Sequence, residues 1–146
     1  MKIIAQKMKP KNRQGGFSLI ELIVVLVILG LLATVVGPQV IRRLSEGKRD
    51  IAKVQLAELE GALDLFRFDV GRYPSGAEGL QVLIEGGGIE NWGGPYLKKI
   101  TLPKDPWGRD YEYRSPGQYG PDYDLWCFAA DGREGGEDDA EDVTSW

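Results

Sequence analysis

The chain has 146 residues, a net charge of −4, no histidine and one cysteine, Cys127. This length allows one globular domain beside a short accessory segment, and a single cysteine excludes an intrachain disulfide. The lack of histidine removes the commonest general base and transition-metal ligand. The acidic balance argues against nucleic acid as a partner, because phosphate binding needs a basic surface.

Residues 1–16 form a basic leader. They hold five of the 18 basic residues and no acid, so the remainder carries 13 basic against 22 acidic side chains, a net charge of −9. Basic residues beside an apolar segment stay on the cytoplasmic side of a membrane. We therefore expect a cytoplasmic N-terminus and a C-terminal domain on the outer side of that membrane.

An apolar run, residues 17–37, follows the leader; its 21 residues include a single charge, Glu21. A transmembrane helix needs about 20 such residues, so the run predicts a membrane-spanning helix. An acid inside a span costs roughly 2.5–3.5 kcal/mol on insertion scales and usually has a purpose. Cleavage between Gly16 and Phe17 would create an α-amino group about one helical turn from this carboxylate. The amine that pairs with Glu21 could lie on the same chain or on a neighbour.

A plain signal peptide or signal anchor is an alternative explanation of these features. Signal peptides, however, place their small-residue cleavage site after the apolar region, whereas Gly15 and Gly16 precede it here. The segment Gly16-Phe17-Ser18-Leu19-Ile20-Glu21 resembles the signature of type IV prepilins at every position. This resemblance implies cleavage after Gly16 by a prepilin peptidase, N-methylation of Phe17, and pairing of Glu21 with the terminal amine of an adjacent subunit.

Three residues, Gly30, Gly37 and Pro38, interrupt the apolar run. Proline usually kinks or breaks a helix, although membrane helices commonly tolerate such residues. The resemblance to prepilins implies that the segment 30–38 can loosen when subunits pack in a filament.

Beyond Pro38 the pattern becomes amphipathic. Apolar residues recur at spacings of three and four, which predicts one buried helical stripe: Ala52, Leu56, Leu59, Leu63, Phe66 and Val70. The predicted helix runs from Phe17 to about Val70, where Gly71 and Pro74 end it.

After this helix the chain turns to short elements. Ser75 is expected near the N-cap of a short helix that reaches Ile84. Two β segments, 111–114 and 123–129, are separated by Gly and Pro turns and predict a hairpin, with four aromatic residues covering the helix: Tyr111, Tyr113, Trp126 and Phe128. The expected fold class is α+β and type IV pilin-like: a long N-terminal helix, transmembrane and then amphipathic, packed against a small antiparallel β-sheet. The expected divisions are 1–16, 17–37 and 38–146.

Several short motifs sharpen the resemblance, which covers essentially the whole chain after the leader. The segments 94–99 (Gly-Pro-Tyr-Leu-Lys-Lys), 105–108 (Asp-Pro-Trp-Gly) and 130–132 (Ala-Asp-Gly) are similar to those of the major pseudopilin of the type II secretion system. This family consists of structural subunits, not enzymes.

The family resemblance implies a subunit of the bacterial inner membrane that polymerises into a periplasmic pseudopilus and drives export of folded proteins across the outer membrane. The implied partners are further copies of the chain, the prepilin peptidase, minor pseudopilins, and an inner-membrane assembly platform with its ATPase. The alternatives are a type IV pilin or minor pseudopilin and, in another class, a membrane-anchored periplasmic binding module.

Residues 131–142 form an acidic loop, with seven acids against one base, Arg133. Such a run is typical of a solvated tail, but calcium also takes carboxylate and carbonyl oxygens from one short loop. On charge alone both explanations stay open. The resemblance to major pseudopilins implies one structural calcium, held by the side chains of Asp131, Asp138 and Asp139 and by backbone oxygens around Phe128 and Arg133. Cys127 is expected to be a buried or strand residue without chemistry.

Overall fold

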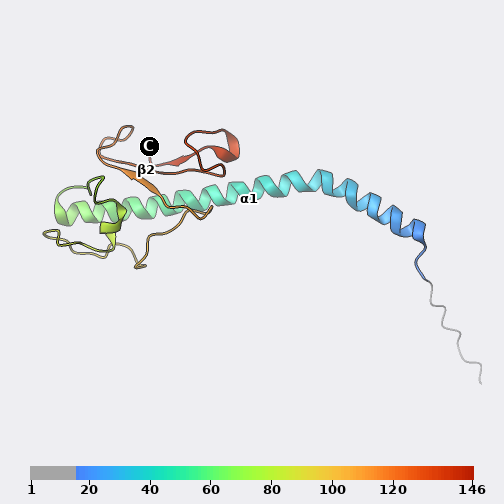
Figure 1. Cartoon of the computed structure of the whole chain (residues 1–146), viewed down its shortest axis with the longest axis horizontal. Coiled ribbons are helices and arrows are strands. Elements are labelled where there is room, and N and C mark those ends of the chain that lie inside the picture. The colour runs from blue at the N-terminus through green and yellow to red at the C-terminus, as the bar shows by residue number, and fades with distance from the viewer. Residues whose placement is uncertain (1–15) are drawn as a thin grey trace, which may run out of the picture. The chain divides into compact units, whose positions relative to one another are not determined.

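The computed structural model describes residues 16–146, apart from the side chain of Asp139. The residues form two compact units, of which the first ends at Gln39 and the second runs from Val40 to Trp146. The elements shown in Figure 1 are, in chain order, α1 (Leu19–Val70), the 3₁₀ helix η1 (Leu80–Leu83), β1 (Glu112–Arg114), β2 (Asp124–Cys127), the 3₁₀ helix η2 (Asp138–Ala140) and β3 (Val143–Thr144). Most of the predicted leader, residues 1–15, lies outside the described residues.

Helix α1 confirms the predicted N-terminal helix. It begins at Leu19, two residues after the predicted start, and ends at Val70. Gly71 ends it in a left-handed conformation (φ +84°) and donates its N–H to the Arg67 carbonyl at 2.8 Å, as glycine does at many helix C-termini. Pro38 lies inside α1 without ending it, because a helix can lose one N–H donor while the neighbouring turns stay bonded. The loosening of segment 30–38 in a filament stays a prediction.

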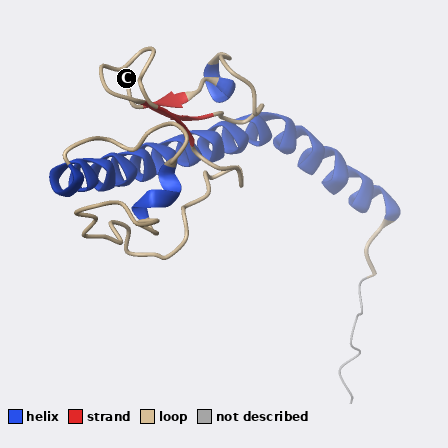
Figure 2. Ribbon diagram, turned by 60° about the vertical axis from the view of Figure 1, so that its left-hand side comes forward, coloured by secondary structure: helices blue, strands red, loops and turns tan. Residues whose placement is uncertain are grey.

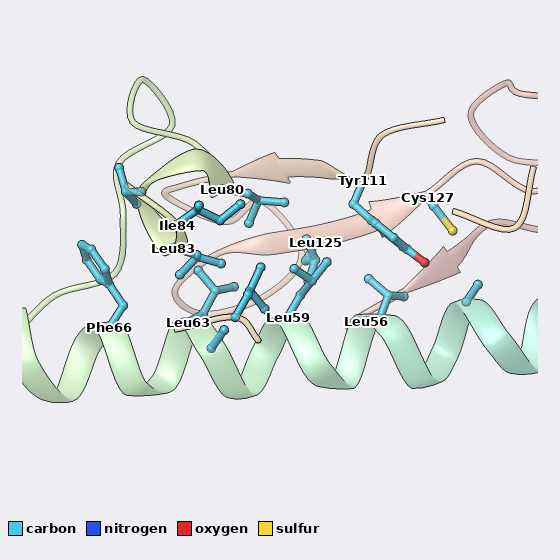
Figure 3. Close-up of a cluster of buried hydrophobic side chains, with 14 of the residues drawn as sticks. Leu56, Leu59, Leu63, Phe66, Leu80, Leu83, Ile84, Tyr111, Leu125 and Cys127 are labelled. Atoms are coloured by element: carbon cyan, nitrogen blue, oxygen red, sulfur yellow. The ribbon is translucent and has the colours of Figure 1, made fainter. Parts of the chain in front are cut away.

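The predicted stripe on α1 is the helix's contribution to the core. Its first five residues are buried, and Val70 packs against the same cluster. Figure 3 shows Leu56, Leu59, Leu63 and Phe66 pointing from α1 toward side chains of the covering layer: Leu80, Leu83, Ile84, Tyr111, Leu125 and Cys127. The core of the second unit is therefore a single apolar layer between one helix and the strands and loops that follow it.

The sheet has three antiparallel strands beside the second part of α1 (Figure 2). Strands β1 and β2 form the predicted hairpin, with Tyr113 opposite Leu125 and Arg114 opposite Asp124. Strand β3, which the sequence analysis did not predict, pairs with the other edge of β2 and places Val143 opposite Cys127. The central strand is therefore β2, with Leu125 and Cys127 fully buried.

The prediction that Trp126 and Phe128 cover the helix is wrong. Successive side chains of a strand point to opposite faces, and Leu125 and Cys127 occupy the helix-facing positions of β2. Trp126 and Phe128 belong to the other face, where their rings meet edge to face with centroids 6.4 Å apart. Tyr111 and Tyr113 do contact the core as predicted.

The predicted N-cap role of Ser75 is also wrong. The short helix is the 3₁₀ helix η1, its cap residue is Gly79, and no side chain caps it. The Ser75 N–H and hydroxyl instead donate to the Glu78 carboxylate at 2.7 and 2.9 Å. The Ser-x-x-Glu pattern therefore closes a turn that precedes η1, because the glycine at position 79 separates that turn from the helix.

The packing predicts a large difference between two leucines of α1. Leu59→Ala removes a fully buried side chain and should lower the free energy of unfolding by about 3 kcal/mol through lost transfer energy and a cavity. Leu65→Ala removes an exposed leucine of the same helix and should cost less than about 0.5 kcal/mol. Denaturant unfolding of the full chain in detergent measures both, and equal losses would contradict the assigned core.

Candidate functional site

The predicted processing site lies directly before α1. Gly16, Phe17 and Ser18 precede the helix, and the Ser18 carbonyl accepts the N–H of Leu22 at 3.2 Å. Glu21 lies in the first turn, where the helix dipole favours a carboxylate. Phe17 is 86% exposed. Nothing in this arrangement tests cleavage after Gly16, methylation of Phe17 or the intermolecular pairing of Glu21, which stay predictions.

The first part of α1 exposes apolar side chains along its whole length, from Leu19, Ile20 and Leu22 to Val35 and Val36. The helix contains a segment long and apolar enough to cross a membrane, and none of that segment is buried in the chain itself. A helix that is apolar on all sides is stable in lipid or among other apolar helices. This segment is therefore a surface that needs an apolar environment.

Two of the predicted calcium ligands, the side chains of Asp131 and Asp138, lie on the described part of the acidic loop. The Asp131 carboxylate accepts the N–H of Arg133 at 3.1 Å, and Asp138 starts η2 with a left-handed backbone (φ +53°). The side chain of Asp139 is not among those described. Within residues 16–146, no three His, Cys, Asp or Glu side chains form a group that could hold a metal ion. The calcium site therefore stays a prediction.

Asp142 adds a carboxylate that the sequence analysis did not single out. Its Oδ2 accepts the N–H of Gly135 at 2.8 Å, while its Oδ1 is buried without a hydrogen-bond partner among the described residues. A buried carboxylate oxygen normally has a partner, and a cation would supply one. Nothing in the spacing of the seven acids distinguished Asp142 from the others.

Arg109 contacts the start of the acidic loop. Its Nη2 donates to the Phe128 carbonyl at 2.7 Å and also to the Ala129 carbonyl. Its Nε lies 3.6 Å from Oδ2 of Asp105, a carboxylate that is 4% exposed. The other oxygen of Asp105 accepts the N–H groups of Trp107 and Arg109 at 2.9 and 2.8 Å. The Asp-Pro-Trp-Gly motif is thus a turn that orients Arg109.

Arg49 contacts the end of the same loop from α1. Its Nη1 donates to the carbonyls of Asp138 and Glu141 at 2.5 and 3.0 Å. Its Nη2 pairs with the Glu141 carboxylate at 2.8 Å. In the sequence Arg49 lies three residues before Ala52 and seven before Leu56, on the same helical face as the buried stripe. A charge in phase with that stripe is the signal that could have revealed this contact.

Asp124 organises the β1–β2 connection and was also missed. Its fully buried carboxylate accepts the N–H groups of Gln118, Tyr119 and Gly120 at 2.7–3.0 Å and pairs with Arg114. Burial alone would raise the pKa of this carboxyl, but the bonds from these backbone groups and from Arg114 together hold the pKa below its ordinary value. The observed hairpin register places Arg114 opposite Asp124, and the sequence analysis predicted the two β segments without a register, so it did not reveal this pair.

Cys127 is a fully buried residue of β2, as predicted. Burial raises the pKa of its thiol to about 12. Because the thiolate is the reactive form of cysteine, this residue is inert in the folded chain.

Comparison with known proteins assigns the family. The family model described as "Type II secretion system (T2SS), protein G" matches residues 39–146. The chain belongs to this family. A second model, "Prokaryotic N-terminal methylation motif", matches residues 11–37 and so contains Phe17 and Glu21.

Individual family members match over nearly their whole length. The chain is 43% identical over 141 residues to "Type II secretion system core protein G" of Pseudomonas aeruginosa, covering 93% of this chain and 97% of that protein. It is 40% identical over 151 residues to the protein of the same name from Vibrio cholerae, covering 95% and 96%. In the crystal structure of the major pseudopilin from the type 2 secretion system of enterohaemorrhagic Escherichia coli, a fold with TM-score 0.57 and 34% identity matches 69% of this chain and 88% of that chain. This protein G chain therefore has the pseudopilin fold.

The Asp124 cluster predicts a pH-dependent contribution to stability. Asp124→Asn should lower the free energy of unfolding by about 2 kcal/mol at pH 7, because the amide cannot replace the carboxylate as acceptor for the three backbone N–H groups and Arg114. The folded-state pKa is below the unfolded value, so the stabilisation is present above about pH 4 and is lost as the pH falls below it. The gap between wild type and variant in denaturant unfolding should therefore narrow from pH 7 to pH 3. Asp110→Asn, which removes an exposed partner of Lys104, is the control, and a gap that is constant with pH would contradict the assignment.

Proposed function

We propose that the chain is the major structural subunit that polymerises into the periplasmic pseudopilus of the type II secretion system and thereby drives folded proteins across the outer membrane. The observation that carries this proposal is the match of residues 39–146 to the protein G family together with a methylation motif over residues 11–37. The names of the two relatives, core protein G, and the similarity to a solved major pseudopilin favour the major subunit over a type IV pilin, a minor pseudopilin or a binding module.

In this proposal the prepilin peptidase cleaves the leader after Gly16, and Phe17 becomes the methylated N-terminus. The chain then waits in the inner membrane with its N-terminus facing the cytoplasm and the second unit in the periplasm, consistent with the basic leader. An assembly platform with its ATPase would add it to a filament that also contains minor pseudopilins. The role is structural, and we assign no catalytic residue.

The exposed apolar part of α1 would form the filament core. Packed copies would bury the side chains that a single chain leaves exposed, and this burial favours association. Within that core Glu21 would meet the terminal amine of a neighbour, where opposite charges about 4 Å apart attract by roughly 4 kcal/mol at an effective dielectric of 20. The pairing would set the axial position of each subunit.

We also propose that the acidic loop binds one calcium ion. The side chains of Asp131, Asp138 and Asp139 and the backbone oxygens of Phe128 and Arg133 would hold it. The support is the resemblance to major pseudopilins, the all-oxygen donor set, which suits a hard cation, and the unpartnered buried oxygen of Asp142. When bound, the ion would link the two ends of the loop in a domain that cannot form an intrachain disulfide.

The assembly role is tested at Glu21. Glu21→Gln should leave the chain processed and inserted in the membrane, because the leader and the span are unchanged. Pseudopilus formation and export of a folded substrate should fall by about tenfold or more, since the charge pair contributes several kcal/mol. Fibre shearing and secretion assays in a strain that lacks the native subunit measure both. Glu46→Gln, an exposed acid farther along α1, is the control, and normal assembly of the Glu21 variant would contradict the proposed pairing.

The calcium site is tested by thermal unfolding of the full chain in detergent, with 1 mM calcium chloride or with excess chelator. A ligand at 100 times its Kd stabilises the folded state by about 2.7 kcal/mol, so Tm should rise by about 10 °C. Asp131→Ala and Asp138→Ala should abolish the rise, whereas Glu134→Ala, an acid of the same loop outside the ligand set, should retain it. An identical Tm in calcium and chelator would eliminate the metal and leave the loop as a solvated segment.

A further inference from the structure

Two arginines from distant parts of the chain meet the acidic loop at its two ends. Arg109 precedes β1, and Arg49 lies on α1, 89 residues before Asp138. Both guanidinium groups donate to backbone carbonyls of the loop and its borders, although seven carboxylates are nearby in the sequence. Contacts to backbone oxygens fix the path of the chain itself, whereas contacts to exposed carboxylates hold only flexible side chains.

The contact at the start of the loop is made by the guanidinium group of Arg109. Arg109 bridges the consecutive carbonyls of Phe128 and Ala129. Gly132 has φ +68°, a backbone conformation that favours glycine, and a Cβ there would force the guanidinium group of Arg109 to shift away from its present position. The buried carboxylate of Asp105, 3.6 Å from Nε, balances the charge.

The contact at the end of the loop holds the turn of η2. Arg49 is only 18% exposed, and its Nη1 bridges the carbonyls of Asp138 and Glu141. The Asp138 carbonyl also accepts the N–H of Glu141 at 3.3 Å. One donor therefore binds both sides of the same 3₁₀ turn and anchors it to α1.

We propose that Arg49 and Arg109 are positioning residues that fix both ends of the acidic loop through its backbone, so that these ends are folded before any metal binds. The two positive charges also offset part of the repulsion among the acids. Because each arginine binds carbonyls, the carboxylates of Asp131 and Asp138 stay available to a cation. A carbonyl oxygen has two lone pairs, so the bond from Arg109 leaves Phe128 able to accept a second ligand.

This arrangement has a consequence for calcium that rests on the proposed function. A binding site whose competent state is only partly populated shows an apparent affinity reduced by that fraction. With both ends held, calcium would need to order only the middle of the loop. Loss of either arginine contact should therefore weaken calcium binding by the same factor by which it loosens the loop.

The test uses Arg49→Lys and Arg109→Lys, which keep the charge but end one bond short of the Nη atom that binds the two carbonyls in each contact. Hydrogen exchange is measured on the full chain in detergent with excess chelator. In Arg109→Lys the segment 129–134 should exchange about tenfold faster, and in Arg49→Lys the segment 138–142 should do so, each without an effect on the other. Arg42→Lys, an exposed arginine of the same helix, is the control, and segment 56–66 of the core reports global unfolding.

A third variant distinguishes the hydrogen bonds from Arg49 to the loop backbone from its ion pair with Glu141. Glu141→Gln removes the carboxylate partner of Arg49 and leaves both carbonyl contacts, so exchange of segment 138–142 should change less than twofold. The proposal is overturned if Glu141→Gln reproduces the effect of Arg49→Lys, or if neither lysine variant exchanges faster than wild type.

Titration with calcium chloride completes the test. Each lysine variant should show an apparent Kd about tenfold higher than wild type, while Arg42→Lys should not. One outcome is that wild type shows no calcium response while each lysine variant exchanges faster in its own segment with chelator present. In that outcome the positioning role of the two arginines is supported, and the calcium site of the proposed function fails. If calcium binds with equal affinity to wild type and to loosened variants, the positioning role is overturned.

Discussion

The burial of one stripe of α1 is the constraint on which the rest of the second unit depends. A three-stranded sheet with strands of two to four residues cannot form a stable layer alone, because small sheets need an apolar face packed on another element. Leu59, Leu63 and Leu125 are fully buried at this contact. The strands, η1 and the loops between them are therefore ordered by the helix. The loops lie at the edge of that contact, so other interactions have to fix their backbone.

The loops solve this problem with charged side chains that bind the backbone. Asp105 and Asp124 accept N–H groups of the turns beside them, while Arg49 and Arg109 donate to carbonyls of the C-terminal region. Each contact joins a side chain to main-chain groups that lie outside the hydrogen bonds of the β-sheet. A domain with few strand residues thus keeps long irregular segments in place without a disulfide.

The features that repeat along the sequence could be predicted, and those that depend on single contacts could not. The spacing of Leu56, Leu59 and Leu63 revealed the core helix, and the two β segments around Gly-Pro turns revealed the hairpin. Strand β3 was not predicted, because its two residues are too few to show an alternating pattern. Its pairing partner, β2, is also far away in the sequence. The face of β2 that carries Trp126 was misassigned, because the alternation of a strand does not itself say which set of alternate residues faces the helix. For the acidic loop, charge and spacing alone could not choose among seven acids, and the family resemblance supplied the candidate ligands.

Because Cys127 is buried, the reactivity of its thiol can report unfolding of the chain. It is the single thiol, it lies on the central strand against α1, and its raised pKa keeps it protonated. A thiol-reactive dye can therefore label the chain only when β2 separates from the helix, and the labelling rate counts those openings in a native background. Conversely, a cysteine placed on the exposed face of α1 would be labelled selectively. Fluorescent subunits could then be prepared without first removing the natural residue.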